Sequence, residues 1–413
     1  MSNFVKKLEI YALATDPIYI GTGGYTIGRV DNTIVRDPIT NVPKIPGSSL
    51  AGTWRYYVTL EVHKYFADDD LKLEKSKRKE ELEEFLNQEK MNWKDLSENK
   101  KTEFLKQIFK SNKNWILFEG NRFIGIRCAG QDDVPNVERD SENNTGHCGH
   151  CIVCKGFGFS KRDISWQGMI FFSDLQILFF PVFTIKGTKW ITTVSRLKEV
   201  GICSETEPKD NKIRISKSNE DKTKQDSNNK EYLNLGWLYL EIDKQPHEIN
   251  KEKLSRFRFD SHLELEADDI VIVPESLFSH IVNSNLEVRT SVSIDPITGA
   301  AKEGALFTSE AIPRGTIFYG KIRIFDKGAF ESIEGKLKPL PSSEQLICAL
   351  NDSKHFYETL GIGGMTTRGF GRMKVNLWCK EEMKSKEGFI VCNENAQVEC
   401  KKEEQDGNSR SQN

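Results

Sequence analysis

Glycine-rich turns separate the strand-like segments of this chain, and this alternation limits the folds that it can adopt. Three such turns occupy residues 21–28, 46–52 and 361–372. The runs typical of strands are residues 6–14, 169–183, 189–194, 235–242, 288–294 and 316–324. Strong helix patterns are few, apart from residues 53–66, for which a serine of the preceding turn is a suitable N-cap. We therefore expect an α+β fold rather than an alternating parallel sheet.

Three segments read as additions to this core. Residues 68–114 are dominated by Lys, Glu, Asp and Asn, with apolar residues spaced as on amphipathic helices, and predict an inserted helical lobe. Residues 205–231 have almost nothing to bury and predict a flexible insertion. Residues 381–413 predict a polar, disordered tail. The rest of residues 1–380 is expected to form a single domain.

Charge and hydrophobicity exclude several classes of protein. The 59 Lys and Arg residues oppose 61 Asp and Glu residues, so nucleic-acid binding would require a local basic surface. The longest apolar run, residues 169–183, is too short for a membrane helix and contains Asp174. The first residues lack the apolar segment of a signal peptide, so we expect a cytoplasmic protein without membrane contact. Nine cysteines, an odd number, favour a reducing compartment and make a disulfide framework improbable.

The sharpest local motif is Cys148-Gly-His-Cys151-Ile-Val-Cys154. Thiolates at this spacing on a tight turn can converge on one tetrahedral zinc ion, at about 2.3 Å from each sulfur. Cys128 is our favoured fourth ligand, and His147 and His150 remain alternatives. Because no Glu-His base motif accompanies the cysteines, we expect a structural rather than a catalytic zinc. Unbound thiols in a flexible loop are the other interpretation.

Two further loops carry groups suited to phosphate chemistry. Residues 21–28 lack the Gly-Lys-Ser/Thr ending of a phosphate-binding P-loop, which argues against an NTPase. Residues 361–372 combine glycines with Thr366, Thr367 and Arg368, so the backbone can approach a ligand while hydroxyls and guanidinium groups meet phosphate oxygens. The same glycines also suit a tight turn near a sheet edge. Asp31, between the first two glycine turns, shares a loop with Asp37 and two arginines, but the residues alone favour an ordinary Asp-Asn turn over a catalytic role.

Four blocks of the chain together resemble a known family. They are Ile20-Gly-Thr-Gly with Asp31-Asn-Thr-Ile-Val-Arg-Asp-Pro and Pro46-Gly-Ser-Ser-Leu-Ala-Gly, then residues 148–159, 289–318 and 361–372. These blocks, in this order, are similar to the RAMP superfamily of CRISPR proteins, and specifically to the repeated backbone subunit of type III effector complexes. Residues 180–190 resemble the III-B branch, whereas the cysteines and residues 32–38 resemble the III-A and III-D branches.

The resemblance implies a ferredoxin-like palm, of the RNA-recognition-motif type, with a hairpin thumb at about 288–320 and a zinc loop at about 128–158. Copies of the chain would form a filament along a CRISPR guide RNA, with other type III subunits, and pair it with complementary target RNA. Leu306 and Phe307 are the thumb residues expected to displace a base pair. Asp31 occupies the place of the family's cleavage aspartate, acting with Mg²⁺ or another divalent ion.

The resemblance also implies a set of RNA-binding residues. They are Gly23, Arg36, Gly47, Ser48, Ser49, Arg55, Gly363, Gly364, Thr366, Thr367 and Arg368. Ala51 stands where the family often has a lysine, which removes one expected phosphate contact. Two other functions remain open: a structural backbone subunit that does not cleave, and a guide-processing endoribonuclease of the same superfamily.

Overall fold

The computed structural model describes most of the chain. The described residues are 4–23, 30–65, 75–130, 146–160, 164–202, 206–208, 211–216, 230–249, 251–259, 263–330, 332, 337–379, 383–384, 390–392 and 398–400. The first glycine turn beyond Gly23, the start of the expected lobe, most of the insertion at 205–231 and most of the expected tail therefore lie outside the described residues. Within the described residues, no helix has the length and hydrophobicity required to cross a membrane.

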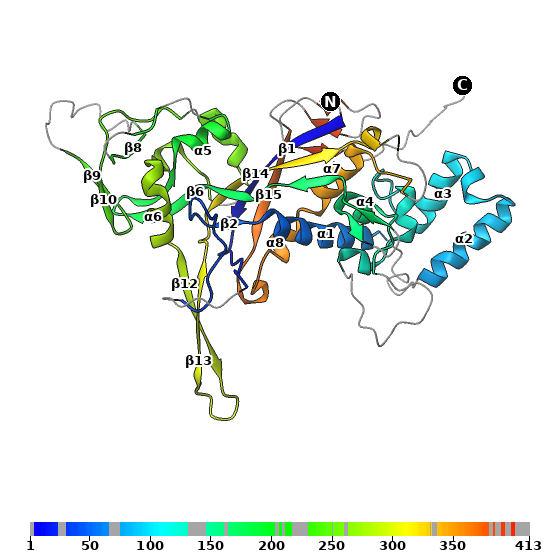
Figure 1. The fold of residues 1–413 in the computed structure, drawn as a ribbon, viewed down its shortest axis with the longest axis horizontal. Helices are drawn as coiled ribbons and strands as arrows, with labels where there is room; N and C mark the ends of the chain where they lie inside the picture. Colours follow the sequence, from blue (N-terminus) through cyan, green and yellow to red (C-terminus); the bar gives the residue numbers. More distant parts are fainter. Residues whose placement is uncertain are drawn as a thin grey trace, which may run out of the picture.

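A large mixed sheet forms the centre of the molecule (Figure 1). Strand β1 (Val5–Ala14), second from one edge, lies antiparallel to both β14 (Ile317–Phe325) and the edge strand β15 (Met373–Cys379). Residues 8–14 of β1 are buried without interruption, as expected for a strand covered on both faces. Leu8, Ile10 and Ala12 face one hydrophobic core, and Tyr11 and Leu13 face the other.

The sheet extends on the far side of β14. That strand pairs antiparallel with β5 (Ile170–Phe172) and with β6 (Leu175–Thr184), and β6 pairs with β7 (Gly187–Thr192). The expected strand at 169–183 is therefore two strands, broken at residues 173–174. The outer strands and the small hairpin beside them are β2 (Lys44–Ile45), β8 (Arg214–Ile215), β9 (Tyr232–Leu235), β10 (Leu238–Glu241) and β11 (Ile270–Ile272).

Helices α1 (Gly47–His63) and α7 (Ser343–Ser353) pack together and share the larger of the two hydrophobic cores. Trp54 is fully buried between them, where its Nε1 donates to the Leu350 carbonyl at 3.2 Å and to Ser353 Oγ at 3.1 Å. The chain thus runs through β1, α1, β5 with β6, β14, α7 and β15. The mixture confirms the α+β prediction.

Helix α1 begins earlier than the sequence predicts. It starts at Gly47 rather than residue 53, and no serine side chain caps it. The Gly47 N–H instead donates to Asp174 Oδ1 at 2.8 Å, so a carboxylate from the break between β5 and β6 satisfies the free amide that a serine would otherwise bind. The expected serine cap is therefore wrong, because a distant residue in sequence supplies the same interaction.

A helical lobe occupies one end of the molecule (Figure 1). Its helices are α2 (Lys75–Glu89) and α3 (Glu98–Ile108), and Phe85 and Phe104 pack between them with ring centroids 4.7 Å apart. The remaining short elements are α4 (Ile152–Phe157), α5 (Val194–Glu199), α6 (Glu275–Ser284), α8 (Phe356–Thr359), β3 (Phe159–Ser160), β4 (Ser165–Trp166), and 3₁₀ turns at Trp93–Asp95, Glu119–Phe123, Ile126–Ala129, Lys251–Phe257, Ala267–Asp269, Lys327–Phe330 and Thr366–Arg368.

A two-stranded hairpin projects from the body as an arm (Figure 1). It consists of β12 (Glu287–Ile294) and β13 (Ala301–Ala311), which pair antiparallel. The hairpin ends sooner than the expected boundary at residue 320, because the chain turns at Pro313 and Gly315 and enters the central sheet as β14. The arm is thus a separate two-stranded unit attached by its base.

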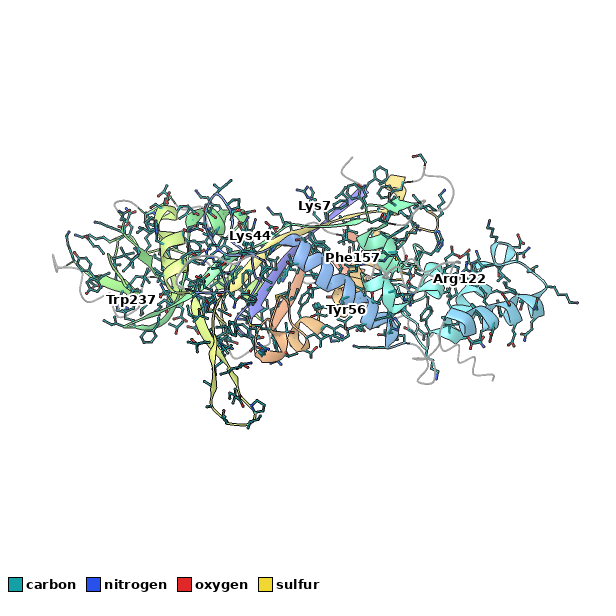
Figure 2. The ribbon with its side chains drawn as sticks, turned by 60° about the horizontal axis from the view of Figure 1, so that its bottom comes forward. Lys7, Lys44, Tyr56, Arg122, Phe157 and Trp237 are labelled. Carbon is teal, nitrogen blue, oxygen red and sulfur yellow. A yellow bond between two sulfur atoms is a disulfide. The ribbon has the colours of Figure 1, made fainter. Side chains whose placement is uncertain are left out.

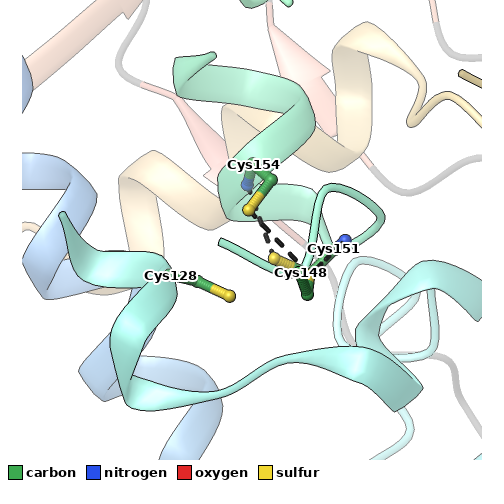
Figure 3. Close-up of side chains that lie close together, drawn as sticks. All are labelled: Cys128, Cys148, Cys151 and Cys154. Carbon is green, nitrogen blue, oxygen red and sulfur yellow. Dashed lines mark hydrogen bonds between the residues drawn. The ribbon is translucent and has the colours of Figure 1, made fainter. Parts of the chain in front are cut away.

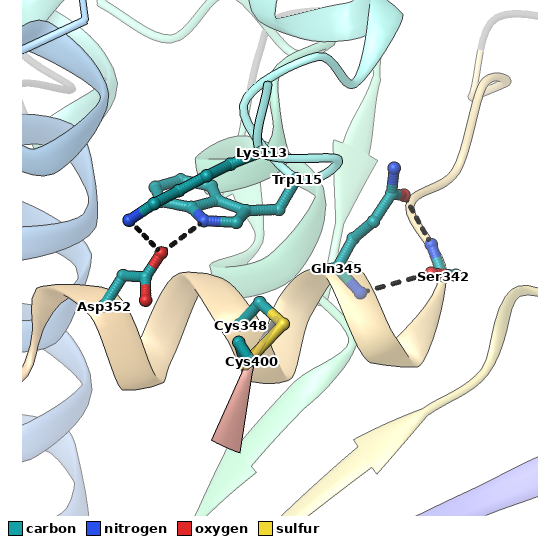
Figure 4. Close-up of a disulfide and its surroundings, with 7 residues drawn as sticks. All are labelled: Lys113, Trp115, Ser342, Gln345, Cys348, Asp352 and Cys400. Atoms are coloured by element: carbon teal, nitrogen blue, oxygen red, sulfur yellow. Dashed lines mark hydrogen bonds and ion pairs between the residues drawn. A yellow bond between two sulfur atoms is a disulfide. The ribbon is translucent and has the colours of Figure 1, made fainter. Parts of the chain in front are cut away.

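The region after β15 contains structure that the sequence did not predict. Strands β16 (Met383–Lys384), β17 (Ile390–Cys392) and β18 (Glu399–Cys400) form a small sheet within the expected tail. A disulfide joins Cys348 of α7 to Cys400 of β18 (Figure 4). The sequence favoured reduced cysteines and did not predict this disulfide, whose two residues are 52 apart in sequence and have no spacing motif.

Trp54 offers a test of the packing of α1. We expect Trp54→Ala to lower the free energy of unfolding by about 3–5 kcal/mol, because it creates a cavity and removes two buried hydrogen bonds. Tyr56→Ala, on the exposed side of the same helix, should cost about 1 kcal/mol or less. Urea unfolding of both variants measures the difference, and equal losses would contradict the packing described.

Candidate functional site

The loop that contains Asp31 is attached to the base of the projecting hairpin. Asn32 forms a bridge with Ser309 of β13: its N–H donates to the Thr308 carbonyl at 3.0 Å, and its carbonyl accepts from the Glu310 N–H at 3.0 Å. The Asn32 side chain also donates to Ser309 Oγ at 3.2 Å. This short segment therefore runs along the edge of β13 like a third strand.

The Asp31 carboxylate lies at the surface and is bound by one residue of the hairpin. Its Oδ2 accepts hydrogen bonds from the Thr308 N–H at 2.8 Å and from Thr308 Oγ1 at 2.9 Å, and Oδ1 accepts neither. These hydrogen bonds, the backbone one first, lower the pKa of Asp31 below its ordinary value. The carboxylate is consequently ionised at neutral pH.

Arg36 closes the same loop from inside. Its Nε donates to Asn283 Oδ1 at 2.9 Å, Nη1 to the Ile34 carbonyl at 3.0 Å and Nη2 to Glu310 Oε2 at 2.8 Å. All three guanidinium nitrogens are thus used within the protein, between α6, the loop and β13. The structure places Arg36 as a support of the Asp31 loop rather than as an exposed cation.

The glycine turn at the start of α1 has a clear packing requirement. A Cβ on Gly47 would lie 2.8 Å from the Phe172 carbonyl oxygen, so no larger residue fits where the turn meets β5. Ser48 is exposed beside it. Ser48, Gly52 and Tyr56 are spaced four residues apart and form an exposed stripe along α1. Tyr56, which Figure 2 labels, was not foreseen from the sequence.

The glycine-rich loop at 361–371 is attached to the segment before the Asp31 loop. Gly361, Gly363, Gly369 and Gly371 have positive φ angles, and a Cβ on Gly363 would lie 2.2 Å from the Tyr19 carbonyl oxygen. The Gly364 N–H donates to that carbonyl at 3.0 Å. The glycines therefore serve close packing, as in the tight-turn interpretation, while Thr367 and Arg368 remain exposed.

The residues expected to bind RNA fall into two groups by exposure. Those at the surface are Gly23, Ser48, Gly363, Thr367 and Arg368, and those half or fully buried are Arg36, Gly47, Ser49, Arg55, Gly364 and Thr366. The two expected thumb residues, Leu306 and Phe307, are 62% and 49% exposed. Because side chains alternate along a strand, Leu306 shares a face of β13 with Thr308.

Four cysteine side chains meet at the N-terminal end of α4 (Figure 3). Both α4 and the 3₁₀ turn that contains Cys128 contact α1. The Sγ atoms of Cys128, Cys148, Cys151 and Cys154 all lie within 4.8 Å of one another and all four residues are buried. The Cys148 and Cys154 sulfurs are 3.9 Å apart. Four thiolates around a tetrahedral zinc ion would be about 3.8 Å apart, so this arrangement fits one zinc-sized ion.

Backbone amides support the cysteine cluster. The N–H groups of His150 and Cys151 donate to Cys148 Sγ, and the Cys154 N–H donates to Cys151 Sγ, at 3.2–3.4 Å. Such hydrogen bonds stabilise thiolates. Of the three fourth ligands left open by the sequence, the geometry favours Cys128, whose sulfur lies with the other three.

Arg55 connects this cluster to α1. Its Nε donates to the Cys128 carbonyl at 2.8 Å, and its Nη2 lies 2.8 Å from His147 Nδ1. Arg55 therefore holds the cysteine loop against the helix, and it faces that loop rather than the exposed stripe of Ser48 and Tyr56. The buried His147 contacts Arg55 and its Nδ1 lies 3.9 Å from Cys154 Sγ, but the ligand atoms that all lie close to one another are the four sulfurs.

These features agree with the comparison to known families. The RAMP superfamily model matches residues 12–374, and the chain therefore belongs to the RAMP superfamily. Over 233 residues it is 23% identical to the Cmr endoribonuclease Cmr4 of Pyrococcus furiosus, covering 51% of this chain and 69% of that protein. The expected kinship with type III RAMP backbone subunits is thereby confirmed.

One further curated protein and one solved structure show a weaker similarity. The Cms endoribonuclease Csm3 of Methanothermobacter thermautotrophicus is 38% identical over 60 residues, which are 14% of this chain and 24% of that protein. The structure of the type III-B Cmr-beta complex in its apo state contains a chain with a TM-score of 0.45 and 13% identity, over 90% of this chain and 96% of that one.

The cysteine cluster makes a direct prediction about metal content. We expect about one zinc ion per chain, and we expect Cys128→Ser to lose it and to lower the melting temperature, because binding of structural zinc is coupled to folding. His150→Ala should retain the metal. Metal analysis of freshly purified, reduced protein measures both. Retention by the Cys128 variant with loss by the His150 variant would reverse the assignment of the fourth ligand.

Proposed function

We propose that this chain is the guide-RNA-binding backbone subunit of a type III CRISPR ribonucleoprotein, and that it cleaves complementary target RNA at regular intervals through Asp31. The observation that carries the proposal is the attachment of the Asp31 carboxylate to Thr308, two residues from Leu306 on the same strand. The residue expected to cut is therefore held by a strand residue that lies two positions from the residue expected to displace a base pair.

The strand order supports the palm in this proposal. The order β15, β1, β14 and then β5 with β6, linked through α1 and α7, is compatible with the antiparallel βαββαβ arrangement of a ferredoxin-like fold. The hairpin of β12 and β13 would be the thumb, and the cysteine cluster a structural zinc site that fixes the loop beside α1. Residues 1–380 would then form one palm-and-thumb domain with insertions.

The ionised Asp31 carboxylate defines the chemistry that this chain can contribute. A carboxylate with a lowered pKa is a weak proton acceptor but a good ligand and orienting group for a positively charged or hydroxyl partner. Bound Mg²⁺ or another divalent ion would supply neutralisation of phosphate charge. Asp31 would align the 2′-hydroxyl of a target nucleotide freed from pairing, and Thr308 would keep the carboxylate in place.

Guide binding is proposed for the exposed members of the two glycine turns. Ser48, Thr367 and Arg368 present hydroxyl, amide and guanidinium donors suited to phosphate oxygens. Arg36 and Arg55 would act indirectly, through the loops that they hold. A narrow surface of this kind is compatible with the net charge of −2, since base pairing with the guide supplies the sequence specificity. The assembly would work in the cytoplasm, with copies of this chain and other type III subunits.

The cleavage role is tested with Asp31→Asn in the assembled complex. We expect guide RNA to be retained, and cleavage of matching target RNA in Mg²⁺ to fall by about 100-fold or more, because the carboxylate charge is lost while its shape remains. Asp37→Asn is the matched control, since the Asp37 carboxylate accepts from the amides of Ile39 and Thr40 in the same loop. Gel analysis of end-labelled target measures the rate.

The outcomes separate the functions that the sequence left open. If the complex with the Asp31 variant cleaves target RNA as fast as the wild type, this chain is a structural backbone subunit and not the nuclease. Cleavage of free repeat RNA by the isolated chain would favour a guide-processing endoribonuclease. Loss of bound RNA from the wild-type complex would contradict guide binding itself.

Arg368 tests the RNA-binding surface. No carboxylate among the described residues forms an ion pair with its exposed guanidinium. We expect Arg368→Ala to weaken binding of single-stranded RNA. The slope of the logarithm of the binding constant against the logarithm of the salt concentration should become shallower by about 0.7, the value for one phosphate contact. Lys198→Ala, an exposed cation on α5, should change neither quantity. Titrations of the full chain at several salt concentrations measure both.

A further inference from the structure

The base of the hairpin is attached to both candidate loops at once. On β13, Thr308 binds Asp31 and Ser309 binds Asn32. On β12, Arg289 lies directly opposite Ser309, donates through Nη1 to the Gly369 carbonyl at 3.2 Å, and lies over the Phe370 ring at 4.7 Å. Any movement of the hairpin base is therefore transmitted to the Asp31 loop on one edge and to the glycine-rich loop on the other.

We propose that Thr308 is a positioning residue for Asp31, through which the orientation of the hairpin controls whether the carboxylate is held ready for cleavage. This inference rests on the proposed function. Thr308 need not touch the reacting atoms, since it acts by fixing the carboxylate that does.

The hydrogen-bond geometry gives Thr308 a double role. Its Oγ1 donates to Asp31 Oδ2 at 2.9 Å and also accepts from the Asp31 N–H at 3.0 Å, while its own N–H donates to Oδ2 at 2.8 Å. One hydroxyl thus fixes both the backbone and the side chain of Asp31. Both hydrogen bonds to the carboxylate end on Oδ2, so the orientation of the carboxylate plane is set by a residue of the hairpin.

The hairpin is well suited to transmit a change. A two-stranded ribbon is marginally stable alone, and both strands here carry exposed apolar side chains, among them Val288, Ile294 and Leu306. Contact with RNA or with another chain along this arm would favour one orientation over others. Because Thr308 and Leu306 share one face of β13, a displacement of Leu306 by a bound partner would shift Thr308, and with it the Asp31 carboxylate, along a single strand.

The neighbouring charges remain in place when Thr308 is changed. The Arg36–Glu310 ion pair lies two residues along β13, and Arg289 lies on the opposite strand. Thr308→Val keeps the size of the side chain and the backbone N–H donor but removes the hydroxyl, whereas Thr308→Ser keeps the hydroxyl. Thr290 is directly opposite Thr308 and is exposed, so Thr290→Val is a matched control on the same hairpin.

The test compares these variants and Asp31→Ala in the purified complex, with bound guide and matching target RNA in Mg²⁺ as the probe. We expect Thr308→Val to slow single-turnover cleavage by about 10- to 100-fold, the effect of losing a hydrogen bond to a charged group. The acid limb of its pH–rate profile should move to higher pH, because the hydroxyl that lowers the pKa of Asp31 is gone. Thr308→Ser should restore both quantities, and Thr290→Val should match the wild type.

The results distinguish this inference from the proposed function. Cleavage lost in Asp31→Ala but unchanged in rate and pH profile in Thr308→Val would overturn the inference alone. Undiminished cleavage by Asp31→Ala would overturn both. Guide occupancy reports assembly of each complex, and if Thr308→Val fails to assemble, Thr308→Ala provides the same comparison. A slow Thr308→Val variant that Thr308→Ser does not rescue would also overturn the inference, because the hydroxyl would then not be the cause.

Discussion

The burial of β1 on both faces is the constraint on which the rest of the molecule depends. A strand with two hydrogen-bonded neighbours and a core on each side cannot shift register without exposing one set of side chains. It therefore fixes β14 and β15, which in turn fix where the hairpin and the glycine-rich loop leave the sheet. The chain that follows β1 from Ala14 passes between the hairpin base and the glycine-rich loop, and this path brings Asp31 to the hairpin base.

The sequence predicted which segments form strands and helices more accurately than where those elements begin and end. Runs of branched and aromatic residues identified β1, β7, β12 and β14, because period and composition are local properties. The start of α1 was missed because the partner of the Gly47 N–H is Asp174, 127 residues away. The pairing of Cys348 with Cys400 was missed for the same reason, since no local signal specifies it.

The candidate site shows the same division. The cysteine triplet could be read from spacing, because tetrahedral coordination imposes a pattern on the chain. Cys128 was the favoured fourth ligand among three candidates, and its sulfur does lie with the other three. The roles of Arg36 and Arg55 could not be predicted from the sequence. The resemblance suggests cations near RNA, whereas the fold turns both guanidinium groups inward. Thr308 carries no sequence signal at all. Its contact with Asp31 arises only when residues 277 positions apart meet.

The extended geometry of β13 sets a fixed distance between Leu306 and Thr308. Leu306 and Thr308 lie two positions apart, with Phe307 between them, so about 7 Å of extended strand separates them. In the proposed function, this stretch of backbone would serve as a molecular ruler between the displaced nucleotide and the scissile bond. The offset would then be the same for every guide, because covalent geometry and not nucleotide identity sets it.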